Sequence, residues 1–297
     1  MKLAIIGDMH QQFDADDISF FNASDYDALL FVGDLASKNP ESVFKLLPHL
    51  ESLTKPAYLI LGNHDTTGIR QLIGEITHAD FLVQLGTPAQ TERMERLKNT
   101  LKHVTLCGYS IHDLGDIRLL AARPFSMGDS RASKVAHPMR LTVNFKPYMQ
   151  KNYNVATLQD SALKLQSLIN AVNPPYLILA HNGPYGLGKK VTDLFGADFL
   201  PEETDFGDRD LKAAIDYAHK IGKPPLAVVA GHMHYPTKHG NIMKEWYKVQ
   251  EDVHYINAAR WPRIFRNEGR LVHHHVALSF EGKNCIVEAR EIVYHSM

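Results

Sequence analysis

The chain has 297 residues, of which 44% are hydrophobic and 22% are charged. This balance is typical of a folded globular protein and excludes a disordered chain, a collagen-like repeat and a coiled coil. Lys and Arg together number 32 and Asp and Glu together number 33, so the net charge is −1. Because a nearly neutral chain lacks the basic excess of a nucleic-acid coat or a polybasic membrane binder, we expect neither kind of partner.

Cysteine usage and hydropathy place the chain in a reducing compartment. The two cysteines, Cys107 and Cys285, are too few for a disulfide framework or a thiolate zinc site, and we expect both in the core. No apolar run approaches the roughly 20 residues that cross a bilayer. The N-terminal apolar stretch is too short for a signal peptide and has no cleavage site after it. We therefore expect a cytoplasmic protein.

Short apolar runs alternate with amphipathic stretches along the chain, which is the pattern of β–α units. The predicted buried strands are 3–6, 28–32, 57–61, 176–180 and 226–230. Each is about as long as a strand that is buried on both faces of a sheet. The pattern therefore predicts an α/β protein with parallel strands.

Capping residues indicate where the helices between these strands begin. Asn39 precedes a Pro and a helical pattern, which Pro48 is expected to kink or end. Thr157 and Asp160 resemble a capping box at the start of a second helix. Asp210 is expected to cap a third.

The C-terminal part predicts antiparallel strands. Residues 253–258 read as a strand, and 272–280 and 285–293 flank a hairpin turn at 281–284. A mixed sheet or a second sheet follows from this hairpin. We expect one domain over 1–297 with a cap or insertion at about 124–156, because that region is rich in Pro and basic residues and fits neither a helix nor a strand.

Each of the five predicted buried strands is followed at once by side chains that bind metals. They are Asp8 and His10, Asp34, Asn63, His181, and His232 and His234. Ligand sites in α/β sheets lie beyond the carboxyl ends of the strands. Seven oxygen and nitrogen ligands are too many for one tetrahedral zinc ion, but they suit two divalent ions that share a carboxylate. The mixture of imidazole and carboxylate favours Mn, Fe, Zn, Co or Ni over Ca.

These motifs carry a resemblance to a known superfamily. Their order is Asp8-x-His10, Gly33-Asp34, Gly62-Asn63-His64-Asp65, His181 and Gly231-His232-x-His234. In type and order they resemble the motifs of the calcineurin-like metallophosphoesterases, over most of the chain. The resemblance implies a four-layer α/β/β/α sandwich that hydrolyses phosphoesters with two divalent metal ions, of which Mn, Fe and Zn are expected first.

The resemblance also implies a role for each residue of these motifs. Asp8, His10 and His234 would hold one metal ion, Asn63, His181 and His232 the other, and Asp34 would bridge them. A hydroxide between the metals would attack phosphorus in line. His64, oriented by Asp65, would then protonate the leaving group, a task that suits a side chain titrating near neutral pH.

Two sequence differences from the protein phosphatases of the superfamily limit the class of substrate that we expect. Their Asp-Arg-Gly element is absent after Asp34, and the third motif ends in Asp65 where they carry Glu. We therefore expect a small phosphomonoester or phosphodiester, such as a nucleotide. Segments 205–211 and 255–260 are also similar to a subgroup found in cyanobacteria and plastids, which implies no particular substrate.

Other polar residues near the motifs are weaker candidates. Asn182 follows a predicted ligand, and Arg260 and Arg263 follow a predicted strand, so each is considered for binding phosphate. The run His273-His274-His275 looks like a metal tract. Because it lies in a hairpin strand, where successive side chains face opposite ways, we expect a non-catalytic role for it.

Three alternatives to a phosphoester hydrolase fit the sequence less well. A nuclease on the same scaffold is disfavoured by the net charge of −1. A catalytically inactive interaction module is disfavoured because the ligand set is complete. An aspartyl-phosphate phosphatase needs a second carboxylate where this chain has His10. The choice between monoester and diester, the native metals and the oligomeric state stay open.

Overall fold

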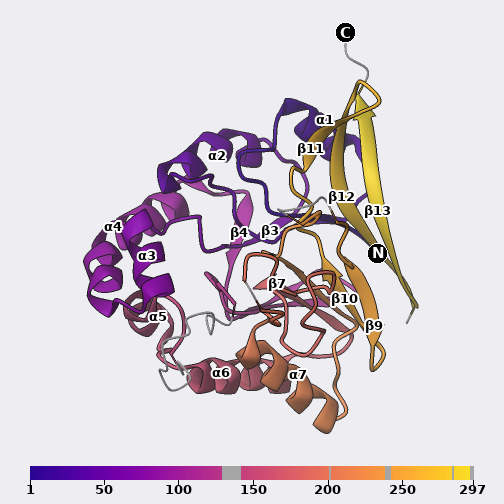
Figure 1. The fold of residues 1–297 in the computed structure, drawn as a ribbon. Helices are drawn as coiled ribbons and strands as arrows, with labels where there is room; N and C mark the ends of the chain where they lie inside the picture. The colour runs from indigo at the N-terminus through magenta and orange to yellow at the C-terminus, as the bar shows by residue number, and fades with distance from the viewer. Residues whose placement is uncertain (129–141, 201, 238–241, 283, 295–297) are drawn as a thin grey trace.

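The computed structural model describes residues 1–128, 142–200, 202–237, 242–282 and 284–294. Two mixed β-sheets lie at its centre and helices cover their outer faces, which confirms the predicted α/β/β/α sandwich (Figure 1). Among the described residues, no helix is both long enough and apolar enough to cross a membrane.

The first sheet contains four parallel strands and an antiparallel C-terminal part. Its strands are β1 (Lys2–Ile6), β2 (Ala28–Phe31), β3 (Ala57–Ile60), β4 (Val104–Cys107), β11 (Ile264–Asn267), β12 (Arg270–Glu281) and β13 (Asn284–Tyr294). Their order is β11-β12-β1-β2-β3-β4, and β13 also pairs with β12. The pairing of β12 with β13 confirms the predicted hairpin, and β12 joins the sheet antiparallel to β1.

The second sheet repeats this arrangement with fewer antiparallel strands. It contains β5 (Ser110–Asp113), β6 (Arg118–Ala121), β7 (Tyr176–Asn182), β8 (Ala227–Gly231), β9 (Tyr247–Gln250) and β10 (Val253–Asn257), in the order β5-β6-β7-β8-β10-β9. Strands β6, β7, β8 and β10 are parallel. Parallel strands in both sheets therefore bring several carboxyl ends together.

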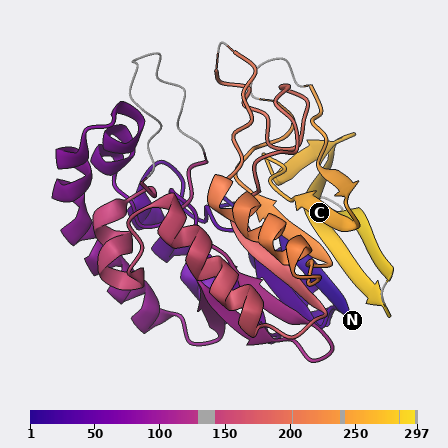
Figure 2. The same cartoon turned by 90° about the horizontal axis from the view of Figure 1, so that it is seen from below.

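The helices of the described residues form the two outer layers. They are α1 (Ala15–Ala23), α2 (Val43–Glu51), α3 (Ile69–Thr77), α4 (Asp80–Thr100), α5 (Lys146–Tyr153), α6 (Leu158–Ala171) and α7 (Arg209–Lys220), with a 3-10 turn at Pro40–Ser42. Helices α6 and α7 lie side by side (Figure 2). The Thr157–Asp160 capping box is present at the start of α6, as predicted.

Burial on both faces explains why the central strands are continuously apolar. On β1, Leu3 and Ile5 belong to the core between the two sheets, whereas Ala4 and Ile6 belong to the core under the helices. Successive side chains of a strand point to opposite faces, so each face of β1 needs its own apolar residues.

Two helix boundaries differ from prediction. Pro48 does not end helix α2, which continues to Glu51, so of the two predicted effects of Pro48 the helix end is wrong and the kink stays a prediction. Asp208, rather than Asp210, is the N-cap residue of α7. Asp210 instead lies buried in the first turn, where its carboxylate accepts a hydrogen bond from Arg123 at 2.7 Å. The buried Arg123 thus forms ion pairs with both Asp208 and Asp210 at the start of α7.

Among the described residues of the region predicted as an insertion, one helix is present. Helix α5 lies within 124–156, although the sequence pattern predicted neither helix nor strand there. Its first-turn proline, Pro147, is compatible with a helix start. Residues 129–141 of the predicted insertion lie outside the described residues, and the single-domain organisation stays a prediction.

Candidate metal centre

The seven predicted ligands lie at the carboxyl ends of parallel strands from both sheets. Asp8 and His10 follow β1, Asp34 follows β2, Asn63 follows β3, His181 is near the end of β7, and His232 and His234 follow β8. The pairing of β7 with β8 shifts register between Leu179 and Asn182. Such irregularities re-aim side chains next to functional sites, and this one includes His181.

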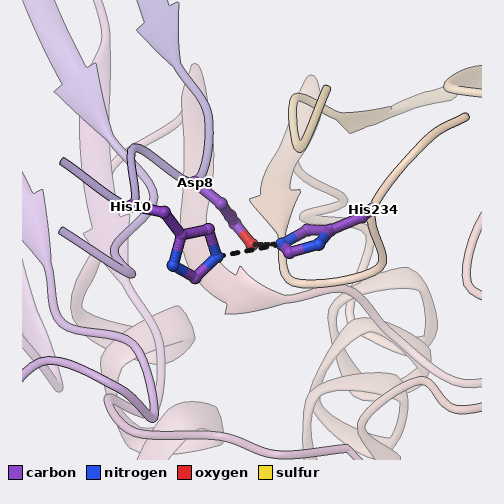
Figure 3. A group of neighbouring side chains, drawn as sticks. All are labelled: Asp8, His10 and His234. Atoms are coloured by element: carbon purple, nitrogen blue, oxygen red, sulfur yellow. Dashed lines mark hydrogen bonds and ion pairs between the residues drawn. The ribbon is translucent and has the colours of Figure 1, made fainter. Parts of the chain in front are cut away.

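The first group of ligands consists of Asp8, His10 and His234, whose side chains point toward one another (Figure 3). His234 Nε2 lies 3.0 Å from Asp8 Oδ2 and 3.1 Å from His10 Nε2. The Nδ1 of His10 lies 2.9 Å from the carbonyl oxygen of Ala36. Because a carbonyl only accepts, Nδ1 carries the proton and Nε2 presents a lone pair to the group.

The second group consists of Asp34, His181 and His232, with Asn63 beside them. His181 Nε2 lies 3.1 Å from Asn63 Oδ1 and 3.2 Å from His232 Nδ1. His181 Nδ1 donates to the carbonyl oxygen of Val32 at 2.7 Å, so Nε2 again carries a lone pair. A main-chain carbonyl on the outer nitrogen is the usual arrangement for a metal-binding histidine.

Asp34 lies between the two groups. Its Oδ2 is 3.9 Å from His10 Nε2, and its Oδ1 is 3.6 Å from His181 Nε2. The two oxygens of one carboxylate therefore face ligands of different groups.

The charges of the centre suit cations. Burial and the proximity of His181 lower the pKa of His232 to about 3, so its imidazole is neutral and able to bind a metal at pH 7. Burial acts to raise the pKa of Asp34, but the surrounding histidines, led by His181, outweigh it and lower the pKa. The pKa of Asp8 is lowered as well, because the hydrogen bond and charge of His234 are the main effects that outweigh burial. The ionised carboxylates and the neutral His232 are in the forms that bind metal, whereas Asp34 and Asp8 outweigh burial and raise the pKa of His181, so a metal ion there would displace a proton.

The backbone is strained at three of the predicted ligands. His10, Asp34 and His232 have φ values of 40°, 49° and 70°. Residues other than glycine rarely adopt positive φ, and such residues cluster at functional sites. The surrounding packing must therefore hold these three residues in place.

The glycines that precede two of the motifs lie so close to a neighbouring carboxylate that a Cβ would not fit. A Cβ on Gly62 would lie 2.2 Å from Asp34 Oδ1, and a Cβ on Gly231 would lie 2.2 Å from Asp8 Oδ1. Because those oxygens belong to predicted ligands, any larger residue at either position would displace a carboxylate of the centre.

The two predicted catalytic residues occupy different surroundings. The ring of His64 lies 5.7 Å from the ring of His10, and its main-chain N–H donates to Asp34 Oδ1 at 2.9 Å. Asp65 is buried, and its four hydrogen bonds come from the main-chain N–H groups of Asp34, Leu35, Ala36 and Gly62. Asp65 therefore ties the loop after β2 to the loop after β3. The sequence interpretation, in which Asp65 orients the His64 ring, missed these partners.

The predicted substrate-binding residues have partners within the protein. Asn182 is buried, and its Nδ2 donates to the carbonyl oxygen of Phe206 at 2.9 Å. The Arg260 guanidinium lies 3.5 Å from the ring centroid of Phe265. Binding of phosphate by Asn182 and Arg260 stays a prediction. Arg263, also considered for phosphate, is fully buried and ion-paired with Asp17, so it is not available to a substrate.

Two aromatic residues beside the centre were not predicted. Trp261 stacks on His234 with ring centroids 5.7 Å apart and planes inclined by 15°. Phe206 stacks on His232 at 6.2 Å and 14°. Both lie in irregular segments without hydropathy periodicity. Only the proximity of Trp261 to Arg260 in the sequence could have drawn attention to it.

The donor set fits two divalent cations. Each group offers three ligand atoms that lie within 4.8 Å of one another, and all are imidazole nitrogens or carboxylate oxygens. These atoms are those that Mn, Fe and Zn bind in proteins. Carboxylate oxygens and imidazole nitrogens that converge in this way could share a cation in each group.

Comparison with known proteins identifies the family. Residues 1–256 match the model of the calcineurin-like phosphoesterases, and the chain belongs to this family. The protein is therefore a metal-dependent phosphoester hydrolase of a family that uses a dinuclear divalent metal centre. The match ends before the β12–β13 hairpin. No curated protein matches the sequence.

Two solved structures are similar to the chain at low sequence identity. One is a metallophosphoesterase from Sphaerobacter thermophilus, with 13% identity and a TM-score of 0.33, over 99% of this chain and 90% of that one. The other is Vacuolar Protein Sorting 29 from Cryptosporidium parvum, with 9% identity and a TM-score of 0.32, over 99% of this chain and 98% of that one.

Proposed function

We propose that the chain hydrolyses a small phosphomonoester or phosphodiester, such as a nucleotide, at the centre described above. Asp8, His10 and His234 would hold one divalent ion, Asn63, His181 and His232 would hold the other, and Asp34 would bridge them. The observation that carries this proposal is the position of Asp34, whose two oxygens face His10 and His181 respectively. We expect Mn²⁺, Fe²⁺ or Zn²⁺ as the ions.

The chemistry divides between the ions and the side chains. When bound, two divalent ions would activate a water and offset the charge that develops on the phosphoryl oxygens. His64 would donate a proton to the leaving oxygen. Its ring lies beside His10 and its backbone is held by Asp34, which supports a position next to the reacting group. Asp65 would act as a positioning residue through the main chain of both loops.

The test is a paired assay on purified protein from which metals have been removed. Mn²⁺ is added, and nitrophenol release is followed from 4-nitrophenyl phosphate and from bis(4-nitrophenyl) phosphate. We expect turnover that depends on Mn²⁺ and is abolished by a chelator. The ratio of the two rates distinguishes a monoesterase from a diesterase.

A His64→Ala variant tests the proton donor separately from the metals. We expect kcat to fall by about 10²–10⁴-fold with the metal content unchanged, because the ring donates a proton and is in excess of the ligands. His103→Ala is the matched control, since the His103 side chain is 68% exposed and pairs with Glu51. Absence of turnover with any divalent metal, together with less than one bound metal per chain, would instead favour an interaction module.

A further inference from the structure

Trp261 presents an exposed aromatic surface at the edge of the first ligand group. It stacks on His234, its ring centroid lies 6.2 Å from that of His10, and its plane is perpendicular to the His10 ring at 89°. The residue is nevertheless 44% exposed. The His234 side chain is itself 34% exposed. The ring therefore lies where the first group opens to solvent.

The backbone around Trp261 is held in place before any ligand arrives. Its N–H donates to the carbonyl oxygen of Tyr235 at 2.9 Å, and Tyr235 pairs with Arg260 in a parallel bridge. Tyr235 is only 2% exposed. This bridge joins the loop after β10 to the loop after β8, which carries His234. Because the aromatic ring is already fixed, a planar ligand that stacks on it loses little of the protein's conformational freedom.

The corresponding aromatic residue of the second group is not available. Phe206 stacks on His232 but is only 7% exposed, since Phe199 packs against it with centroids 5.0 Å apart. A ligand can therefore reach an aromatic surface beside the first group through Trp261, whereas Phe206 is used in packing.

Trp261 and His64 both lie beside His10. Their rings are 6.2 Å and 5.7 Å, respectively, from the His10 ring. If His64 protonates the leaving oxygen, as in the proposed function on which this inference rests, then the leaving alcohol lies next to His10, whose ring Trp261 also borders. Nucleobases stack on aromatic side chains in a way that tolerates different bases.

We propose that Trp261 forms a stacking subsite for a planar ring of the leaving alcohol, so that the preferred substrate is a phosphoester of a nucleoside or a similar aromatic alcohol. The subsite selects the leaving group by its flat surface. Hydrogen-bonding groups of a particular base are not part of this selection.

Fluorescence provides a binding readout that does not depend on turnover. The chain contains two tryptophans, so a Trp246→Phe variant leaves Trp261 as the sole tryptophan fluorophore. The Mn²⁺-loaded variant is mixed with AMP or with ribose 5-phosphate, which differ only in the base, and emission is read before turnover. We expect saturable quenching by AMP and none by ribose 5-phosphate. Equal responses to the two compounds, or no response to either, would overturn the subsite.

Kinetics test the same subsite through the leaving group. For the wild type, kcat/KM is compared between a phosphoester with an aromatic alcohol, 4-nitrophenyl phosphate, and AMP and ribose 5-phosphate. Trp261→Leu is expected to lower the preference for AMP over ribose 5-phosphate about tenfold, mainly through KM, as for the loss of one base–aromatic stack. Trp261→Tyr keeps a ring and should retain most of the preference. Phe199→Leu, which changes an exposed aromatic residue beside the other group, should leave it unchanged.

The outcomes separate this inference from the proposed function. Metal-dependent hydrolysis with an unchanged preference in Trp261→Leu would overturn the stacking subsite alone. A wild-type chain without metal-dependent hydrolysis would overturn the proposed function. The fluorescence titration with AMP would still show whether a base stacks on Trp261. If Trp261→Tyr loses the preference as fully as Trp261→Leu, the residue acts through the structure of the loop and the inference fails.

Discussion

Histidines gather in two regions of this molecule, and the regions differ in how the rings are used. At the strand ends, His10, His181, His232 and His234 come from different loops, and their ring nitrogens face one another and the carboxylates of the centre. On β12, His273, His274 and His275 are consecutive and buried, but each ring has separate surroundings. The histidine rings at the strand ends thus converge on one site, whereas those of β12 pack separately in the interior.

The β12 histidines are divided between the two faces of their sheet. His273 Nδ1 lies 3.1 Å from Asp17 Oδ1, and His275 Nε2 lies 2.7 Å from the Tyr26 hydroxyl. His274 faces the opposite way and packs edge-on against Tyr235. Alternation along a strand prevents consecutive histidines from meeting at one ion.

One part of the β12 region does resemble a ligand group. Asp14, Asp17 and His273 offer ligand atoms within 4.8 Å of one another. The buried Arg263 forms an ion pair with Asp17, however, and so supplies the positive charge that a metal would otherwise bring. The strand-end centre is therefore distinguished by candidate ligand atoms that converge without a paired arginine such as Arg263. The number of histidines close together in the sequence does not distinguish it.

The largest expected effect comes from removing a ligand of the strand-end region. His181→Ala should lose metal from the second group and lower kcat/KM by about 10⁴-fold, because a metal ion contributes several kcal/mol to stabilising the transition state. His274→Leu is the matched control, since both rings are buried. Metal analysis and kinetics measure the two variants. Metal loss in the control as well would remove the distinction between the regions.

Breaking the ion pair of the β12 region should affect stability instead. Arg263→Met leaves Asp17 buried without its partner, and we expect the free energy of unfolding to fall by about 3–4 kcal/mol. Adding Asp17→Asn should recover part of this loss, because the uncompensated charge is removed. Urea unfolding measures both variants, and metal content should not change. A double variant as unstable as the single one would show that packing, rather than charge, dominates here.

The smallest expected effect is a pH dependence of stability. Burial, with the charges of Arg260, His275 and Arg263, lowers the pKa of His274 to about 3, against about 6.5 in the unfolded chain. Between these values the unfolded chain binds a proton that the folded chain does not, so stability is present above pH 6.5 and is lost as the pH falls below it.

From pH 7 to pH 5 this histidine should therefore contribute a loss of about 2 kcal/mol to the wild type, and His274→Leu should lose that much less. Urea unfolding at the two pH values measures the difference. Parallel losses in His274→Leu and the wild type would mean that the buried ring accepts a proton.

Local patterns were sufficient for much of the fold. The predicted strand 57–61 corresponds to β3, and the predicted turn at 281–284 corresponds to the β12–β13 hairpin. The capping box at Thr157 was also predicted, because its hydrogen bonds join residues three positions apart. The N-cap of α7 was misplaced from Asp208 to Asp210, because either Asp can precede a helix; both carboxylates instead form ion pairs with the distant Arg123, which the local pattern does not show.

The sequence by itself determined which strands end in Asp, Asn and His side chains and which family the motifs indicate, because strand burial and strand-end motifs are visible in short local patterns. Only the tertiary structure decided that Asp34 faces both ligand groups, that Asp65 binds the main chain of two loops, and that Trp261 covers His234. These contacts join residues from loops that are far apart in the chain. The contacts of Asp65 and Trp261 depend on which strands are neighbours within one sheet, and that of Asp34 with His181 also depends on how the two sheets pack against each other.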